Sequence, residues 1–165
     1  MIRWFFLYIA KIGPAGSINQ EKAMNVSARN VFKGKISALT DGAVNAEVEL
    51  TLAGGDRIVA IVTEGSVQSL GLAVGKEAVA YVKAPWVMLL SGAPDVHFSA
   101  RNQLSGTVSA LTRGAVNTEV AIMLAGGTVV HSVVTNEAVL ELGLKVGEPA
   151  TALIKASHVI LGIPA

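Results

Sequence analysis

The chain has 165 residues and a net charge of +1, with 52% hydrophobic and only 15% charged residues. A charge this close to zero argues against the broad basic surface that nucleic-acid binding requires. Because the chain has no cysteine, disulfides, thiolate metal sites and cysteine nucleophiles are excluded, and a reducing cytoplasm is the compartment we expect.

The first 23 residues differ in character from the rest of the chain. Residues 4–10 form an apolar run that is too short to span a bilayer. We interpret residues 1–23 as a leader or upstream segment, poorly ordered or loosely docked, with Met24 as the natural start. The alternative, a targeting signal, lacks a clean small-residue cleavage pattern.

From Met24 onward the sequence occurs twice. Ser-Ala-Arg-Asn begins at Ser27 and again at Ser99, and Gly-Ala-Val-Asn begins at Gly42 and again at Gly114. The step of 72 residues holds without a gap, and half of the aligned positions are identical. Such a step has the length of a small domain and is too long for a solenoid repeat. The predicted organisation is a first domain over 24–93, a linker over 94–98 and a second domain over 99–165.

Each copy has the pattern of five strands and one short helix. Alternating apolar residues predict the strands, and helical spacing that ends at Gly71 predicts the first helix. In the first copy we expect strands at 31–40, 43–52, 57–63, 78–83 and 86–90, and a helix at 64–70. In the second copy we expect strands at 103–112, 115–124, 128–135, 150–155 and 158–161, and a helix at 136–142. This order predicts an all-β fold of two tandem OB-like five-stranded barrels.

Catalytic and metal-binding patterns are not found. His97, His131 and His158 are scattered without the spacing of metal ligands, and no Gly-rich phosphate loop leads from a strand into a helix. A carboxylate that both copies keep, Glu47 and Glu119, stands alone. We therefore predict that the protein is not an enzyme and has no cofactor.

Both copies instead keep groups that donate hydrogen bonds to anions. Ser-Ala-Arg-Asn supplies a hydroxyl, a guanidinium, an amide and backbone N–H groups, and Lys83 and Lys155 stand at predicted strand ends. Thr63 and Thr135 occupy N-cap positions before the two helices, where free N–H groups favour anions. A structural alternative stays open, in which the arginines pair with the retained glutamates and the threonines only cap helices.

These motifs together resemble the Mop domain, the molybdenum-pterin-binding protein family within the wider TOBE class of OB-like domains. The resemblance rests on Ser-Ala-Arg-Asn, Gly-Ala-Val-Asn-x-Glu-Val, Thr-x-x-Ser/Ala-x-x-x-Leu-Gly-Leu and Gly-x-x-Ala-x-Ala-x-Val/Ile-Lys-Ala-Pro/Ser, and it covers 24–165 as a di-Mop unit. It implies binding of free molybdate or tungstate, and not of a pterin, at interfaces between modules and subunits. It also implies a homo-oligomer, with a trimer as our expectation.

Carried over motif by motif, the resemblance implies that the Ser-Ala-Arg-Asn and Lys-Ala-Pro/Ser segments line one side of each anion and the helix starts line the other. In the first copy the implied residues are Ser27, Ala28, Arg29, Asn30, Thr63, Ser66, Lys83 and Ala84. In the second copy they are Ser99, Ala100, Arg101, Asn102, Thr135, Asn136, Lys155, Ala156 and Ser157. Pro85 stands where the second copy has Ser157, and Ala138 stands where the first has Ser66, so the copies are not expected to form identical sites. No direct protein–metal ligand is implied.

The resemblance further implies a cytoplasmic protein that stores or buffers molybdate. Because no winged-helix segment precedes Met24 and no Walker motif is present, we expect a free-standing binding protein. One alternative is a molybdate-sensing module that acts with a separate DNA-binding partner. A less favoured alternative is an OB-type nucleic-acid module, because aromatic residues are few and Trp86 has no aromatic counterpart at His158. We expect neither nucleic acid nor membrane as a partner.

Overall fold

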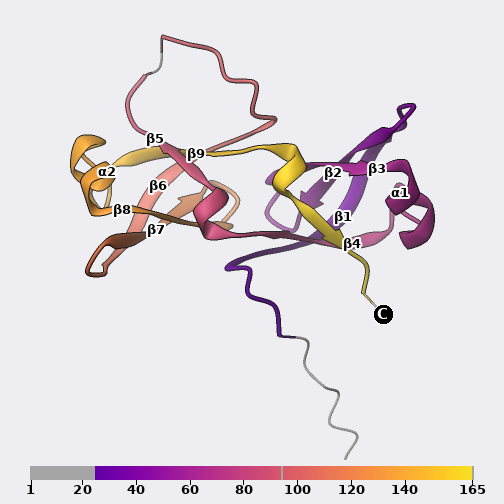
Figure 1. The fold of residues 1–165 in the computed structure, drawn as a ribbon, viewed down its shortest axis with the longest axis horizontal. Coiled ribbons are helices and arrows are strands. Elements are labelled where there is room, and N and C mark those ends of the chain that lie inside the picture. Colours follow the sequence, from indigo (N-terminus) through magenta and orange to yellow (C-terminus); the bar gives the residue numbers. More distant parts are fainter. Residues whose placement is uncertain (1–24, 94, 165) are drawn as a thin grey trace, which may run out of the picture.

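The computed structural model of the chain describes residues 25–93 and 95–164 (Figure 1), so the leader interpretation of residues 1–23 lies outside the described residues. The first copy folds into four strands, a helix, a 3-10 turn and a short fifth strand. In order they are β1 (Asn30–Thr40), β2 (Asn45–Leu52), β3 (Arg57–Thr63), α1 (Glu64–Leu70), β4 (Glu77–Val82), η1 (Ala84–Trp86) and β5 (Met88–Leu90).

The second copy repeats this order. Its elements are β6 (Asn102–Arg113), β7 (Asn117–Leu124), β8 (Val129–Thr135), α2 (Asn136–Glu141), β9 (Pro149–Ile154), η2 (Ala156–His158) and β10 (Ile160–Gly162). No helix in the described part of the chain is long and apolar enough to cross a membrane.

The two copies exchange their last strands. One sheet has the order β10-β4-β1-β2-β3 and the other β5-β9-β6-β7-β8, so each takes four strands from one copy and the fifth from the other. Ile160 pairs with Tyr81 on β4, and Met88 pairs with Leu153 on β9. Each sheet therefore contains residues from both predicted domains, 24–93 and 99–165. The predicted bounds mark the two copies of the repeated sequence.

Long, coiled first strands let each sheet curl around its core. β1 pairs with β4 along its first half and with β2 along its second half, with a register shift between Ile36 and Ala38. Gly34 lies at the change of partner, where an added Cβ would come within 2.6 Å of the Thr51 carbonyl oxygen. A strand can bend this closely over its neighbour only where no side chain intervenes.

The buried side chains of both copies form one continuous hydrophobic core. Ile36, Val48 and Ile58 from the first copy belong to the same cluster as Ile122 and Ile154 from the second. The exchanged strands contribute Leu161 from β10, while Val87 is buried just before β5. Because the core runs through both sheets, the two halves stabilise each other and do not form independent domains.

The predicted all-β fold of two tandem OB-like units with one helix each is confirmed. The helix at 64–70 and the strand at 57–63 have the predicted bounds, and Gly71 is left-handed (φ 58°) at the predicted C-cap. The last strand of each copy differs from the prediction. A 3-10 turn follows Lys83 and Lys155, and the remaining strand has only three residues.

Candidate functional site

The motif residues gather where the first and fourth strands of each copy end. Asn30 pairs with Val82 across β1 and β4, and Asn102 pairs with Ile154 across β6 and β9. Because these strands are antiparallel, the Ser-Ala-Arg segment before β1 lies beside Lys83, which directly follows β4. The second copy places its Ser-Ala-Arg segment beside Lys155 in the same way. The antiparallel register thus brings together, in each copy, two segments that are about 55 residues apart in sequence.

Each lysine begins a 3-10 turn and carries a free charge. Lys83 and Lys155 are the extended residues before η1 and η2, and both side chains are exposed. No ion pair involves either lysine among residues 25–93 and 95–164. The first N–H groups of a helical turn lack partners within the turn, so Ala84 and Ala156 offer backbone donors beside these charges. Both alanine side chains are buried, which fixes the turn against the core.

These turns pack on the opposite copy. η1 lies against β8 and η2 lies against β3. The hydroxyl of Ser132 on β8 donates to the Val87 carbonyl at 2.6 Å, and the rings of Trp86 and His158 meet with centroids 5.4 Å apart. The Lys-Ala segment of one copy is therefore held in place by the edge strand of the other.

The asparagines of the two Ser-Ala-Arg-Asn motifs join the copies. The Asn30 amide donates to the carbonyl of His131 on β8 at 2.8 Å and accepts from the His131 N–H at 2.7 Å. Asn102 makes the same pair of bonds with Val59 on β3, at 2.8 and 2.7 Å. Both amides are buried. Each side-chain amide bonds to the N–H and the carbonyl of one residue, as a neighbouring strand would, and so satisfies backbone groups of the other copy's edge strand.

The arginines of the motifs pair with the glutamates that both copies keep, again across the copies. Arg29 Nε lies 3.4 Å from Glu119, and Arg101 Nη2 lies 2.5 Å from Glu47. This is the pairing of the structural alternative. The arginine side chains remain 67% and 57% exposed, so each guanidinium, with five N–H groups, keeps donors directed to solvent.

The helix starts have the predicted caps. The Thr63 hydroxyl accepts from the Ser66 N–H at 3.1 Å and lies 2.8 Å from the Ser66 hydroxyl, and the Thr135 hydroxyl accepts from the Ala138 N–H at 3.1 Å. Asn136 accepts a hydrogen bond from Thr118 and donates to the Gly114 carbonyl. The Asn136 side chain therefore already holds the turn that precedes β7.

Within the described residues, the predicted anion donors form two separate groups. Ser-Ala-Arg and Lys-Ala come together in each copy, whereas no hydrogen bond or ion pair joins them to Thr63, Ser66, Thr135 or Asn136. Ser157 is exposed on η2, and Pro85 takes its place on η1. Within the same residues no group of His, Asp and Glu side chains is arranged to hold a metal ion.

Sequence reasoning missed one residue near the site. His131 is clamped by Asn30, and its buried Nδ1 lies 3.4 Å from Glu119 Oε1 without making a hydrogen bond within the described part of the chain. The first copy has Val59 at this position. The difference between His131 and the apolar Val59 of the first copy was a visible signal. The hairpin of β7 and β8 places His131 beside Glu119, and only the contact between the copies adds Arg29 to this group.

The TOBE domain description matches the chain twice, over residues 26–89 and 99–161. The chain belongs to the TOBE domain family. A protein of known structure, the cytoplasmic molybdate-binding protein ModG with molybdate bound, is 60% identical to this chain. The alignment covers 86% of this chain and 100% of that one, with a TM-score of 0.82.

Two curated relatives are longer than this chain. The molybdenum-pterin-binding protein MopA of Rhodobacter capsulatus is 46% identical over 141 residues, which are 86% of this chain and 53% of MopA. The molybdenum transport protein ModE of Herbaspirillum seropedicae is 41% identical over 141 residues, 86% of this chain and 52% of ModE. The chain thus spans about half the length of the curated relatives it matches, and these relatives carry the names of binding and transport proteins, not of enzymes.

Proposed function

We propose that this TOBE protein binds molybdate, or the similar anion tungstate, in the cytoplasm and serves to store or buffer it. The observation that carries the proposal is the similarity to a cytoplasmic molybdate-binding protein with molybdate bound. The two chains are 60% identical over the whole length of that protein. The repeated cations and backbone donors at the strand ends are the chemistry that such an anion needs. The proposed role requires neither catalysis nor a cofactor.

The proposed donors suit a tetrahedral dianion, which accepts hydrogen bonds and donates none. In the first copy they are Ser27, Ala28, Arg29, Lys83 and Ala84, and in the second Ser99, Ala100, Arg101, Lys155, Ala156 and Ser157. Charge-assisted hydrogen bonds contribute about 1.5–3 kcal/mol each, so a few of them, offset by desolvation, are enough for micromolar affinity of about −8 kcal/mol. Among these donors Lys83 and Lys155 are the best placed, because no carboxylate neutralises them within the described residues.

We further propose that a neighbouring copy completes each site. Thr63, Ser66, Thr135 and Asn136 make no polar contact with the strand-end donors of their own chain within the described residues. A trimer that brings the helix start of one chain to the strand ends of the next would supply the second half of each site. Binding at a shared site would then stabilise the trimer, because ligand and assembly are linked.

The copies differ in ways that predict two classes of site. Ser157 offers a hydroxyl and a backbone N–H on η2, whereas Pro85 offers neither on η1. Ser66 adds a hydroxyl at the start of α1 that Ala138 cannot supply on α2. A titration of the whole protein should therefore show more than one class of affinity.

Calorimetry with molybdate, tungstate and sulfate tests the proposal. We expect micromolar binding of the first two anions and much weaker binding of sulfate, because the smaller anion cannot reach all donors at once. Sedimentation at equilibrium, with and without molybdate, measures the assembly in the same samples. Equal and weak heats for all three anions would refute selective oxyanion binding.

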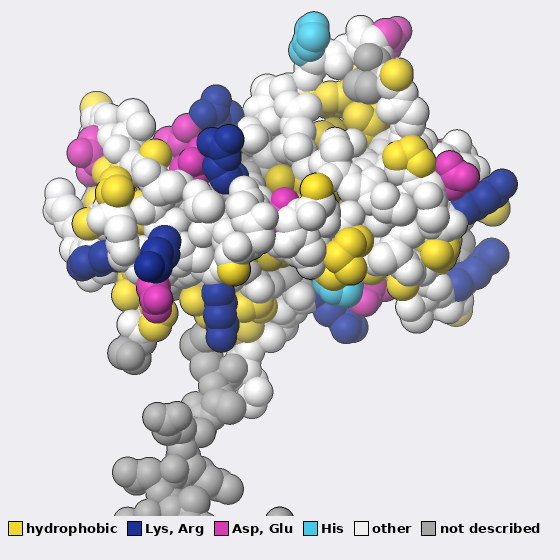
Figure 2. Space-filling model, turned by 180° about the vertical axis from the view of Figure 1, so that it is seen from behind, with side chains coloured by type: hydrophobic (Ala, Val, Ile, Leu, Met, Phe, Trp, Pro, Cys, Tyr) yellow, Lys and Arg dark blue, Asp and Glu magenta, His cyan; other side chains and the backbone are white. Residues whose placement is uncertain are grey.

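A second candidate function is a molybdate-sensing module that works with a separate DNA-binding partner. It is favoured by the similarity to ModE of Yersinia pestis, named a transcriptional regulator, of which the match covers 53%. Affinity capture from the source cell distinguishes the two roles, since a sensor should retain a DNA-binding protein in a molybdate-dependent manner. Direct nucleic-acid binding is disfavoured, because on the face in Figure 2 the Lys and Arg side chains are dispersed among acidic ones and form no continuous strip.

A further inference from the structure

The Glu119 carboxylate lies between two basic side chains that come from different copies. Arg29 Nε of the first copy lies 3.4 Å from Glu119 Oε2, and His131 Nδ1 of the second copy lies 3.4 Å from Glu119 Oε1. Each carboxylate oxygen thus faces one basic group. Because Arg29 is also a proposed oxyanion donor, the state of His131 bears on the charge that an anion meets at this site.

Backbone contacts hold His131 in this place. The Asn30 amide bonds to the N–H and to the carbonyl of His131, at 2.7 and 2.8 Å, and Arg29 is the residue before Asn30. Within the second sheet His131 pairs with Ala121, so Glu119 is its diagonal neighbour on β7. Long side chains reach one another across such a diagonal. The clamp by Asn30 therefore fixes both basic partners of Glu119.

One nitrogen of the His131 ring is buried and unsatisfied. Nδ1 makes no hydrogen bond within the described residues, although the side chain as a whole is 33% exposed. A neutral imidazole has a proton on one nitrogen, whereas a charged imidazole has a proton on both, so uptake of a proton from solvent always gives Nδ1 an N–H to donate. The Glu119 carboxylate is the acceptor in place to receive it. Histidine is the side chain that ordinarily exchanges this proton between about pH 5 and pH 8.

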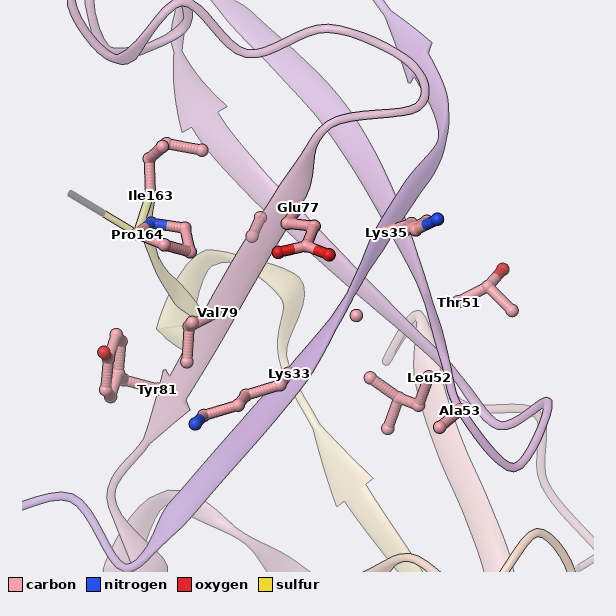
Figure 3. A pocket seen from close by; sticks show the side chains of 12 residues that line it. Lys33, Lys35, Thr51, Leu52, Ala53, Glu77, Val79, Tyr81, Ile163 and Pro164 are labelled. Atoms are coloured by element: carbon pink, nitrogen blue, oxygen red, sulfur yellow. The ribbon is translucent and has the colours of Figure 1, made fainter.

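The elements packed on β8 leave Glu119 and Arg29 as the charges in contact with this ring. β7 has Glu119 as its charged residue, and β5 and η1 have none. On β1, Lys33 extends toward Tyr81 in Figure 3. No ion pair within the described residues joins His131 to Lys33 or to the charged residues at the ends of the neighbouring elements, which are Lys83, Glu137 and Glu141.

We propose that His131 is a positioning residue that controls, through Glu119, how much of the Arg29 charge is available to the oxyanion; this rests on the oxyanion function proposed above. When the ring is neutral, the Glu119 charge offsets the charge of Arg29. When the ring is protonated, Glu119 accepts from Nδ1 and shares its charge with a second cation, so a dianion beside Arg29 meets a more positive surface. The site that uses Arg29 therefore binds its anion more tightly as the pH falls through the histidine range.

The other copy lacks this control. Val59 takes the place of His131, and within the described residues Glu47 forms an ion pair with Arg101 and with no other group. Asn102 holds the Val59 backbone through the same pair of hydrogen bonds, so the two copies differ here in the side chain and not in the backbone contact. Because the fold accepts either residue at this position, His131→Val is the natural test substitution.

Nuclear magnetic resonance of the full chain without any anion tests the coupling directly. The Arg29 Nε signal, assigned by its loss in Arg29→Lys, reports the contact with Glu119. We expect this signal to shift between about pH 7.5 and about pH 6 in the wild type, and to stay in place in His131→Val and in Glu119→Gln. His97→Asn, which removes an exposed histidine and introduces the residue of the first copy at that position, Asn25, is the matched control and should keep the shift.

Calorimetry with molybdate at the same two pH values tests the consequence for binding. At the sites that Arg29→Lys weakens, we expect wild-type affinity to be about two- to fivefold higher at the lower pH, the range that exposed ion pairs support. His131→Val should lose this gain, and Glu119→Gln should bind tightly at both pH values. The part of the response that His131→Val removes is the measure, because His158 lies next to Ser157 in the chain and adds a charge of its own when protonated.

The two measurements separate this inference from the oxyanion function. An Arg29 signal that shifts in His131→Val as it does in the wild type would overturn the coupling, whether or not molybdate binds. A shift that depends on His131, together with molybdate affinity that is equally pH-dependent in His131→Val and the wild type, would overturn the effect on the anion. A shift that depends on His131 in a protein that binds no molybdate would support the coupling and refute the oxyanion function.

Discussion

Gly54 and Gly126 occupy the same position in the two copies and meet at the tips of two hairpins. A Cβ on Gly54 would collide with the Gly126 carbonyl oxygen, and a Cβ on Gly126 would come within 2.5 Å of the Gly54 carbonyl oxygen. The Asp56 carboxylate closes the contact by accepting from the Gly126 N–H at 3.4 Å. The turns that join β2 to β3 and β7 to β8 thus pack backbone against backbone, with the Asp56 carboxylate beside Gly126.

Substitution of either glycine should loosen the junction between the copies. For Gly126→Ala we expect a loss of about 1–3 kcal/mol in the free energy of unfolding, the usual cost of overpacking. Urea unfolding followed by circular dichroism measures it. Gly65→Ala is the matched control. Its Cβ would meet nothing closer than 3.9 Å, and alanine is the better helix former, so stability should hold or rise. Equal stability of Gly126→Ala and wild type would contradict the packing described here.

The asparagine clamps predict a second stability effect. Asn30→Ala leaves the His131 N–H and carbonyl without partners at a half-buried position, and Asn102→Ala does the same at Val59. We expect each variant to lose about 2 kcal/mol or more, because an unsatisfied backbone group costs about 1–3 kcal/mol. Asn45→Ala, at an exposed asparagine, is the control and should change stability by less than about 0.5 kcal/mol. Similar losses from all three would rule out the clamp as the cause.

The strand-end lysines should control affinity without controlling stability. Lys83→Ala and Lys155→Ala each remove an exposed charge that has no ion pair among the described residues, so unfolding should be unaffected. If these lysines contact the dianion, molybdate affinity at the corresponding sites should fall about tenfold or more. Calorimetry on both single variants, with Lys145→Ala for comparison, gives the answer. Wild-type affinity in the double variant would remove the lysines from the site.

Removing the glutamates that pair with the arginines across the copies should have the opposite effect and raise molybdate affinity. Glu119→Gln and Glu47→Gln keep the shape of the side chain but remove a negative charge beside Arg29 and Arg101. Molybdate should then bind several-fold more tightly at low salt, because the arginines no longer share their charge with a carboxylate. The cost in stability should stay below about 1 kcal/mol for ion pairs this exposed. Glu148→Gln serves as the control, and weaker binding in the two test variants would mean that the glutamates position the arginines for the anion.

Local patterns were readable from the sequence, whereas the exchange between the copies was not. The alternation of apolar residues and the caps at Thr63 and Gly71 depend on neighbouring residues, and they predicted the strands and helices closely. The exchange of β5 and β10 leaves no such signal, because the two copies carry similar residues and each strand can satisfy either sheet. Asn30 and Arg29 make their contacts with the other copy, so motif reasoning placed them near an anion but could not place Asn30 on His131 or Arg29 on Glu119.

The exchanged strands also bear on how a protein of this kind can be divided. A fragment that contained only residues 24–93 would present β4 with an open edge and would release Met88–Leu90 with nothing to join. Such an isolated half could complete its sheet only by exchanging its last strand with a second half. Its folding would therefore depend on protein concentration. Covalent linkage of the two halves makes the strand exchange intramolecular. It also allows the sequences of the two halves to differ while both keep the same fold.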